Sequence, residues 1–402
     1  MIKHLFLILL FCYPQLSFSA KPIPPEGIQP YGVDQYCNDF DCVDSLSKFK
    51  NLVEIKPSKN PKPLKEKINL NLADKTMKSR ADIVFEGRPS VALIMIDNNE
   101  IVYQRYAKQI TSTTPLLGFS MSKSLVSLVV GQAFCNGYIK DLDIPTKTIA
   151  PELNGTVYGE STTRQLLMMS SGGPRGTVRH GGTPINADVW NPNSPDLYWN
   201  VLNHLKKFSS PQSKGFIEKV KPGEEFSYKN FDTQALSFLF PIQGDSSFQD
   251  VFQKYVWDIS GAEYSGYWIH DSKNRIHTPS SFHASPLDWA KVAVFVNESI
   301  KFDKSCFGDY IRKATTKQIE NKIAEMGDEY FVGKNFKGYG YQFWTDLSGG
   351  RDGTIPIIMN GWRGQYIIFN PEKNKIMVAF SYEDRNLANL FRLFGSWIHD
   401  PQ

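Results

Sequence analysis

Ser120-Met121-Ser122-Lys123 stands at the head of an apolar run, residues 124–134, that reads Ser-Leu-Val-Ser-Leu-Val-Val-Gly-Gln-Ala-Phe. A helix that is apolar on nearly all sides belongs in a protein core. The run is followed by Asn136-Gly137, where glycine can take the left-handed conformation that ends many helices. Residues three apart are neighbours on a helix, so Lys123 is expected to reach the oxygen of Ser120. The stretch therefore predicts a buried helix that presents a hydroxyl and an amine on one face.

A hydroxyl beside a buried amine can act as a nucleophile with its general base. Serine is a weak nucleophile at its free pKa, and a lysine can activate it if burial lowers the pKa of the lysine. A helix N-terminus also favours a developing anion. The alternative is a helix cap with a snorkelling lysine, because Ser-x-x-Lys is common by chance. Other motifs in the chain are needed to distinguish a catalytic Ser–Lys pair from a helix cap.

The first companion is Tyr228-Lys-Asn230, which follows a turn signal at Pro222-Gly223. Near a cation, the phenol of Tyr228 is expected to ionise more easily and to share the proton transfer with Lys123. Asn230 is expected to hold either the substrate or Lys123 through its side-chain amide. A surface Tyr-x-Asn is the alternative.

The second companion is Asn360-Gly-Trp-Arg-Gly-Gln365, between the strand-like runs 355–359 and 365–369. Glycine within a strand often marks a close approach of another backbone. The backbone N–H groups of Trp362 and Ser120 are therefore expected to form an oxyanion hole. An ordinary hairpin loop is the alternative.

Together with the segment 162–172, Thr-Thr-Arg-Gln-Leu-Leu-Met-Met-Ser-Ser-Gly, these motifs occur in a recognisable order. The order Ser-x-x-Lys, Thr-x-Arg-x-Leu-Leu, Tyr-x-Asn and Gly-x-x-Gly-Gln resembles the serine hydrolases of the β-lactamase-related superfamily. That superfamily includes class C β-lactamases, D,D-peptidases, esterases and 6-aminohexanoate-dimer hydrolases. The resemblance extends over roughly residues 80–400.

The resemblance implies a role for each matching residue. Ser120 corresponds to the acylated nucleophile, Lys123 to its base and Tyr228 to the proton relay to the leaving group. Trp362 falls at the oxyanion-hole position, and the substrate-binding positions are Asn230, Gly361, Arg363 and Gln365. The chemistry implied is acyl transfer that needs neither a metal nor an organic cofactor.

One departure from the family pattern narrows the expected activity. β-Lactamases and D,D-peptidases carry Lys-Thr-Gly where this chain reads Met359-Asn360-Gly361. A thioether cannot replace the point charge of that lysine. We therefore expect an amidase or carboxylesterase, closest in motif to the 6-aminohexanoate-dimer hydrolases. A β-lactamase or D,D-peptidase is the second hypothesis, and a catalytically silent envelope binding protein is the third.

Other site chemistries have little support in the sequence. Gly118-Phe-Ser-Met-Ser122 lacks the final glycine of a nucleophile elbow. The seven histidines are not spaced as metal ligands. A net charge of +4 spread along 402 residues does not indicate a nucleic-acid-binding surface. The expected partner is a small amide or ester, and nucleic acid is not expected.

The N-terminus predicts export. Met1–Ala20 has a basic start, a short apolar region and a small-x-small cleavage site, as in a secretory signal peptide. The apolar region is too short to span a membrane, so no stable membrane insertion is expected once it is removed. The protein is expected to be secreted or periplasmic, in a bacterium. Residues 21–80, rich in proline and lysine, are predicted to be an N-terminal extension of a hydrolase domain at 81–402.

Export makes disulfides possible. Cys37 and Cys42 are expected to close a short loop by a disulfide, because one cysteine pair lacks the other ligands of a metal site. Cys135 is expected to pack in the apolar helix as a small hydrophobe. Cys306 has no assignment.

The resemblance implies an α+β fold of the β-lactamase/D,D-peptidase type, with an antiparallel sheet built from both chain ends and flanked by helices. The hairpin 91–106 and the strands within 339–381 are expected to share the sheet, and a closing helix at 386–398 should pack on it. A helical insert at about 115–290 would place the active site at the junction. The loop 170–196 is expected to build the substrate pocket, with possible aromatic lining from Trp190, Tyr198 and Trp199.

Overall fold

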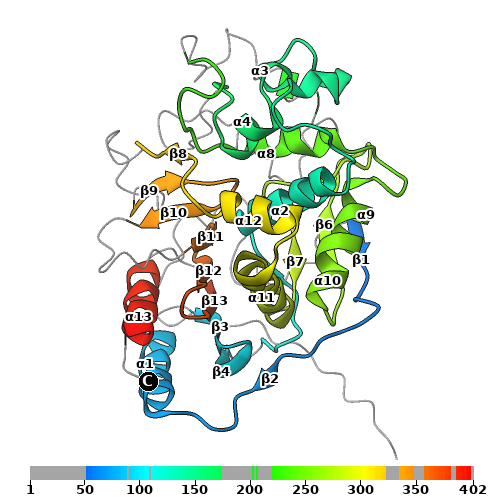
Figure 1. Ribbon diagram of the computed structural model, residues 1–402. Helices are drawn as coiled ribbons and strands as arrows, with labels where there is room; N and C mark the ends of the chain where they lie inside the picture. The colour runs from blue at the N-terminus through cyan, green and yellow to red at the C-terminus, as the bar shows by residue number, and fades with distance from the viewer. Residues whose placement is uncertain are drawn as a thin grey trace, which may run out of the picture.

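Figure 1 shows the chain as a computed structural model, with a sheet that runs from the left of the view down to its lower centre, and a helical part above it and to the right. The structure describes residues 51–87, 90–107, 110–173, 202, 205–206, 220–322, 335–347, 357–381 and 386–399. The expected signal peptide, Cys37, Cys42 and the loop aromatics Trp190, Tyr198 and Trp199 lie outside these ranges.

The main sheet joins the two ends of the chain. Among the described residues it has nine strands in the order β2-β4-β3-β13-β12-β11-β10-β9-β8. All neighbours are antiparallel except β2 and β4. The strands are β2 (Lys65–Glu66), β3 (Ser90–Asp97), β4 (Glu100–Tyr106), β8 (Ile319–Glu320), β9 (Phe336–Tyr339), β10 (Trp344–Leu347), β11 (Ile357–Gly361), β12 (Gln365–Asn370) and β13 (Lys375–Ser381).

Alternation along the strands gives the sheet two apolar faces. In β3, Leu93 and Met95 belong to the cluster that includes side chains of α1 (Leu72–Glu86) and α13 (Leu387–His399). Ala92, Ile94 and Ile96 belong to the other cluster, which includes side chains of α11 (Pro286–Phe302). Successive side chains of a strand point to opposite faces, so both faces of this sheet are covered by helices. The predicted α+β fold is confirmed.

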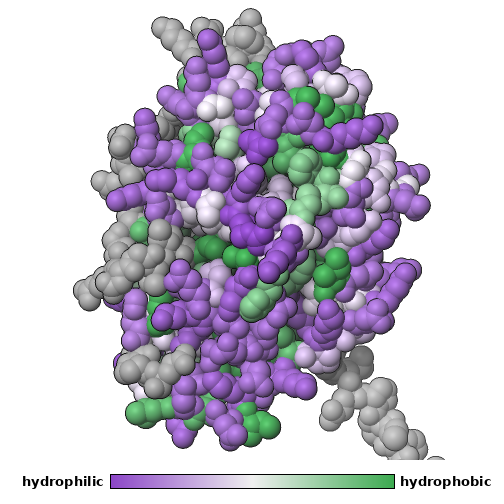
Figure 2. Space-filling model, viewed as in Figure 1, coloured by the Kyte–Doolittle hydropathy of each residue, from purple (hydrophilic) through white to green (hydrophobic). Residues whose placement is uncertain are grey.

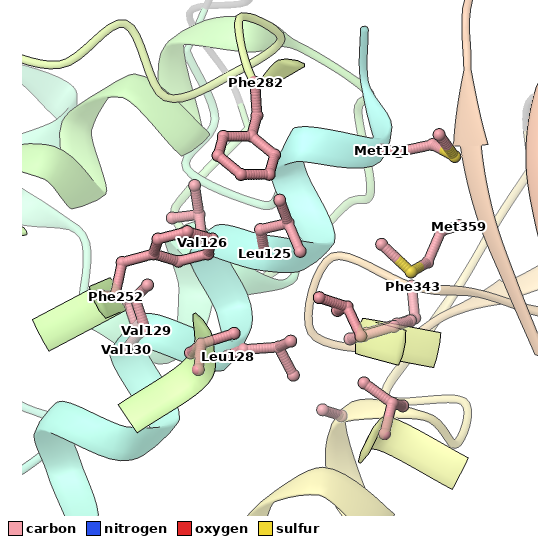
Figure 3. Packing of buried hydrophobic residues seen from close by; sticks show 14 of the residues in the cluster. Met121, Leu125, Val126, Leu128, Val129, Val130, Phe252, Phe282, Phe343 and Met359 are labelled. Atoms are coloured by element: carbon pink, nitrogen blue, oxygen red, sulfur yellow. The ribbon is translucent and has the colours of Figure 1, made fainter. Parts of the chain in front are cut away.

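The helix that carries the Ser-x-x-Lys motif lies between the sheet and the helical part. α2 runs from Met121 to Cys135, Ser120 is its N-cap residue, and Gly137 just beyond it has φ +79°. It contacts β11 and β12, α9 (Phe248–Phe252) and α12 (Cys306–Ala314). Figure 3 shows its apolar side chains between phenylalanines of the helical part on one side and Phe343 and Met359 on the other. The buried helix expected from the sequence is present.

The helical part contains short helices and a second sheet that the sequence analysis did not foresee. Its helices are α3 (Val157–Glu160), α4 (Thr163–Leu167), α8 (Asn230–Leu236), α9 and α10 (Asp258–Ser260), with a π-helical turn at Gln253–Trp257. The second sheet has the order β1-β6-β7-β5 among the described residues. Its strands are β1 (Leu52–Ile55), β5 (Leu116–Leu117), β6 (Gly266–Ile269) and β7 (His283–Ala284).

The described part of the N-terminal segment is joined to the rest of the fold. β1 pairs with β6, and β2 pairs with β4. Lys67 donates hydrogen bonds to Asp74 (2.9 Å) and to Asp97 (2.7 Å), which ties α1 to the end of β3. The boundary expected between residues 80 and 81 falls inside α1.

The prediction for Cys135 as an unpaired small hydrophobe is wrong. Its sulfur forms a disulfide with Cys306 across a sequence separation of 171 residues. The bond joins the last residue of α2 to the first residue of α12, two helices that pack against each other. A hydrophobic helix position does not reveal a partner so distant in sequence, which is why the pair was missed.

The surface fits a globular protein. Figure 2 shows hydrophilic residues over most of the viewed face, with hydrophobic residues in small separate groups. Within the described ranges, no helix has the length and apolar character needed to cross a membrane.

Candidate active site

The first turn of α2 brings Ser120 and Lys123 together. The amine Nζ of Lys123 lies 2.9 Å from Oγ of Ser120. Residue 119 before them has φ +45°, a conformation that is uncommon for a bulky residue. Such backbone strain is typical of functional sites. The predicted hydroxyl–amine pair is therefore formed.

Two further oxygens accept hydrogen bonds from Lys123. Nζ donates to Oδ1 of Asn230 (2.7 Å) and to the backbone carbonyl of Pro279 (2.8 Å). Complete burial lowers the pKa of Lys123 well below its usual 10.5, because burial disfavours the charged form. No carboxylate lies within salt-bridge distance of it in the described part of the chain. A neutral amine has two N–H groups and one lone pair, so the two oxygens leave the lone pair for the Ser120 hydroxyl.

Tyr228 contacts both Ser120 and Lys123. Its side chain hydrogen-bonds to that of Ser120, and its ring centroid lies 5.2 Å from Nζ of Lys123. The ring also packs on Trp344, with the centroids 5.1 Å apart. Burial raises the pKa of Tyr228, and the hydrogen bond with Ser120 only partly opposes this. The expected easier ionisation is therefore wrong: the effect of burial outweighs the hydrogen bond with Ser120, and the phenol stays protonated as a donor.

The end of β11 approaches the loop that carries Ser120. A Cβ atom on Gly361 would lie 2.2 Å from the carbonyl oxygen of Gly118, so only glycine fits there. Phe119 and Trp362 meet edge to face, with ring centroids 5.5 Å apart. The indole of Trp362 is 37% exposed. These contacts place Trp362 beside Ser120, and its role in an oxyanion hole stays a prediction.

Two further residues of the Asn360–Gln365 motif, Arg363 and Gln365, shape the loop after β11. Nε2 of Gln365 donates to the carbonyl oxygens of Trp362 and Arg363 (both 3.0 Å) and of Ser381 (2.6 Å). Arg363 is buried, has φ +65°, and lies over the indole of Trp362 at 4.9 Å. Gln365 thus holds the backbone on both sides of the loop, and the structure gives its amide a positioning role.

The sequence did not reveal the segment around Pro279, which lies next to Lys123. Pro279 contributes only its backbone carbonyl, so no residue-type pattern could have found it. His277 is completely buried near Lys123, and burial lowers its pKa to about 3. It therefore stays neutral at physiological pH and adds no charge beside the amine. Within the described ranges, no group of three or more His, Cys, Asp or Glu side chains could hold a metal ion.

Solved structures with this fold include several hydrolases. A protein from Bacillus anthracis described as a 6-aminohexanoate-dimer hydrolase aligns with a TM-score of 0.68 and 16% identity, over 94% of this chain and 98% of that one. EstCE1, a hydrolase with promiscuous acyltransferase activity, aligns with a TM-score of 0.59 and 12% identity, over 82% and 99%. A class C β-lactamase aligns with a TM-score of 0.57 and 12% identity, over 84% and 99%. At these identities the likeness shows the fold alone.

The sequence itself also matches a family. No curated protein sequence matches the chain, but the sequence model of the Beta-lactamase family matches residues 74–389. That range contains every described strand of the main sheet except β2, together with α2 and every described residue of the candidate site. The chain therefore belongs to the Beta-lactamase family of serine hydrolases.

Proposed function

We propose that this protein is an exported serine hydrolase that cleaves an amide or ester bond of a small substrate through an acyl-enzyme on Ser120. The observation that supports this most is the environment of Lys123. Burial lowers the pKa of its amine, which favours the neutral form, and two carbonyl oxygens accept hydrogen bonds from its N–H groups. Its lone pair is then the base that Ser120 needs.

The proposed reaction has two stages. As Oγ of Ser120 attacks the substrate carbonyl, its proton passes to Lys123 and the carbonyl electron pair moves to oxygen. The N–H groups of Ser120 and Trp362 would stabilise that oxyanion. When the bond to the leaving group breaks, Tyr228 protonates the amine or alcohol and regains a proton from Lys123. Water then attacks the acyl carbon, which releases the acid and restores Ser120.

The residues around the end of β11 favour a substrate that has an uncharged group at the position where β-lactamases bind a carboxylate. Met359 occupies the position of the family lysine and is completely buried in the core beside α2 (Figure 3). Next along the strand edge, the exposed indole of Trp362 offers an apolar surface. This combination favours an amidase or carboxylesterase over a β-lactamase or D,D-peptidase.

Export is supported by two independent features. Met1–Ala20 has the composition of a secretory signal peptide. Cys135 and Cys306 form a disulfide, and disulfides persist mainly in oxidising compartments such as the bacterial periplasm. A secreted or periplasmic location accounts for both.

The test is a substrate panel on the mature protein, with Ser120→Ala as control. We expect p-nitrophenyl acyl esters and short acyl anilides to be hydrolysed, and nitrocefin to be turned over at least about a hundredfold more slowly, because the pairing cation is missing. Ser120→Ala should lose all three activities. Nitrocefin as the preferred substrate would favour the lactamase hypothesis, and inactivity of the folded protein on the whole panel would favour a binding protein.

A further inference from the structure

A lysine within the Tyr-Lys-Asn segment points away from the nucleophile. The backbone at Lys229 is extended, with φ −158° and ψ 150°. Successive side chains of an extended segment point to opposite sides. Because Tyr228 and Asn230 contact Ser120 and Lys123, the side chain of Lys229 lies behind them, on the far side from the site.

That side chain joins a buried polar network. Nζ of Lys229 lies 3.9 Å from Oδ1 of Asp232, and both side chains are completely buried. Nζ also donates to the carbonyl of Gly173 at 3.4 Å. Asp232 accepts from Oγ of Ser171 (2.6 Å) and from its backbone N–H (3.1 Å). The network thus connects the first turn of α8 to the loop at 171–173.

The two charges depend on each other. Burial raises the pKa of Asp232, and the ammonium of Lys229 and the hydrogen bonds from Ser171 oppose that rise. A buried charge that loses its partner is strongly disfavoured. We therefore expect Lys229 and Asp232 to stay close together in the folded protein. Tyr228 and Asn230 are the chain neighbours of Lys229, so the position of this pair also restrains them.

We propose that Lys229 and Asp232 are positioning residues, which hold Tyr228 and Asn230 against the nucleophile by anchoring their segment to the loop at 171–173. This inference rests on the proposed function of Ser120. Asn230 lies 2.7 Å from Lys123, and a displacement of about 1 Å can lower a reaction rate about a hundredfold.

The test compares Lys229→Met and Asp232→Asn with Lys291→Met, a matched control. Lys291 also forms a buried pair with an aspartate three residues away, at 3.5 Å from Asp288 on α11. The measurement is the rate at which a fluorophosphonate labels Ser120, per folded molecule, together with the thermal midpoint. We expect Lys229→Met and Asp232→Asn to label at least about tenfold more slowly than the native protein. Lys291→Met should lower the midpoint but label within about twofold of the native rate.

Several outcomes would overturn the inference. Native labelling rates in Lys229→Met and Asp232→Asn, or an equal slowing in Lys291→Met, would show that the pair contributes only stability. If neither variant folds, Ser171→Ala decides, since it removes one hydrogen bond to Asp232, and an unchanged rate in it would exclude the positioning role. Absence of labelling in the native protein overturns the proposed function as well, whereas native labelling with unchanged variants overturns the positioning role alone.

Discussion

Replacement of Lys123 by methionine is expected to slow the acylation of Ser120 by about a thousandfold or more, within the range of general-base catalysis. The substitution keeps an unbranched chain of similar length in the buried site, but it removes the lone pair that lies 2.9 Å from Oγ of Ser120. The measurement is the second-order rate of fluorophosphonate labelling, followed by mass spectrometry.

The control for this variant is Lys291→Met, which also removes a buried amine. Lys291 is paired with Glu263 and Asp288, so its loss should leave labelling of the folded protein near the native rate. A Lys123→Met variant that labels as fast as the native protein would show that another group is the base.

The pH dependence tests the same base. Burial lowers the pKa of Lys123, and only its neutral form can accept the proton of Ser120. The native labelling rate should therefore rise with pH and reach its plateau well below pH 10.5, the usual lysine pKa. A rate that still rises steeply at that pH would contradict the neutral amine.

Loss of the Cys135–Cys306 disulfide is expected to lower the free energy of unfolding by about 4 kcal/mol, because the bond closes a long loop in the unfolded chain. The loop spans a sequence separation of 171 residues. The measurement is denaturant unfolding of the double variant Cys135→Ala/Cys306→Ala beside the native protein under non-reducing conditions.

Dithiothreitol provides the control for that variant. Cys306 is exposed, so the reductant should destabilise the native protein and leave the double variant unaffected. Labelling of Ser120 at the opposite end of α2 should change little while the protein stays folded. Equal stability of the native protein and the double variant would contradict a stabilising role for the bond.

The elements with strong local patterns could be predicted from the sequence. The hairpin of β3 and β4, the strands β11 to β13 and the closing helix α13 fall within a few residues of the expected ranges. Asn98 and Asn99 at the hairpin turn have positive φ angles, as turn residues of this type often do. Alternation and helical periodicity are local signals, so a single sequence reveals them.

The contacts that remained hidden are distant in sequence. The strand β1 pairs with β6 more than two hundred residues later, and neither is long enough to show a clear alternation. The Cys135–Cys306 pair, the Pro279 carbonyl and the Lys229–Asp232 pair likewise depend on how separate segments pack. The motif order placed Ser120, Lys123, Tyr228 and Asn230 at one site, but the lowered pKa of the lysine depends on burial in the folded protein.

Whether Ser120 is an activated nucleophile is best measured by intact-mass spectrometry of the mature protein after exposure to a reactive fluorophosphonate. Ser120→Ala and Ser124→Ala serve as paired variants, since Ser124 lies one turn along the same helix with its hydroxyl bound to the carbonyl of Gln342. We predict one adduct on the native protein and on Ser124→Ala, and none on Ser120→Ala. An unmodified native protein that is well folded, or an adduct that persists in Ser120→Ala, would contradict the account.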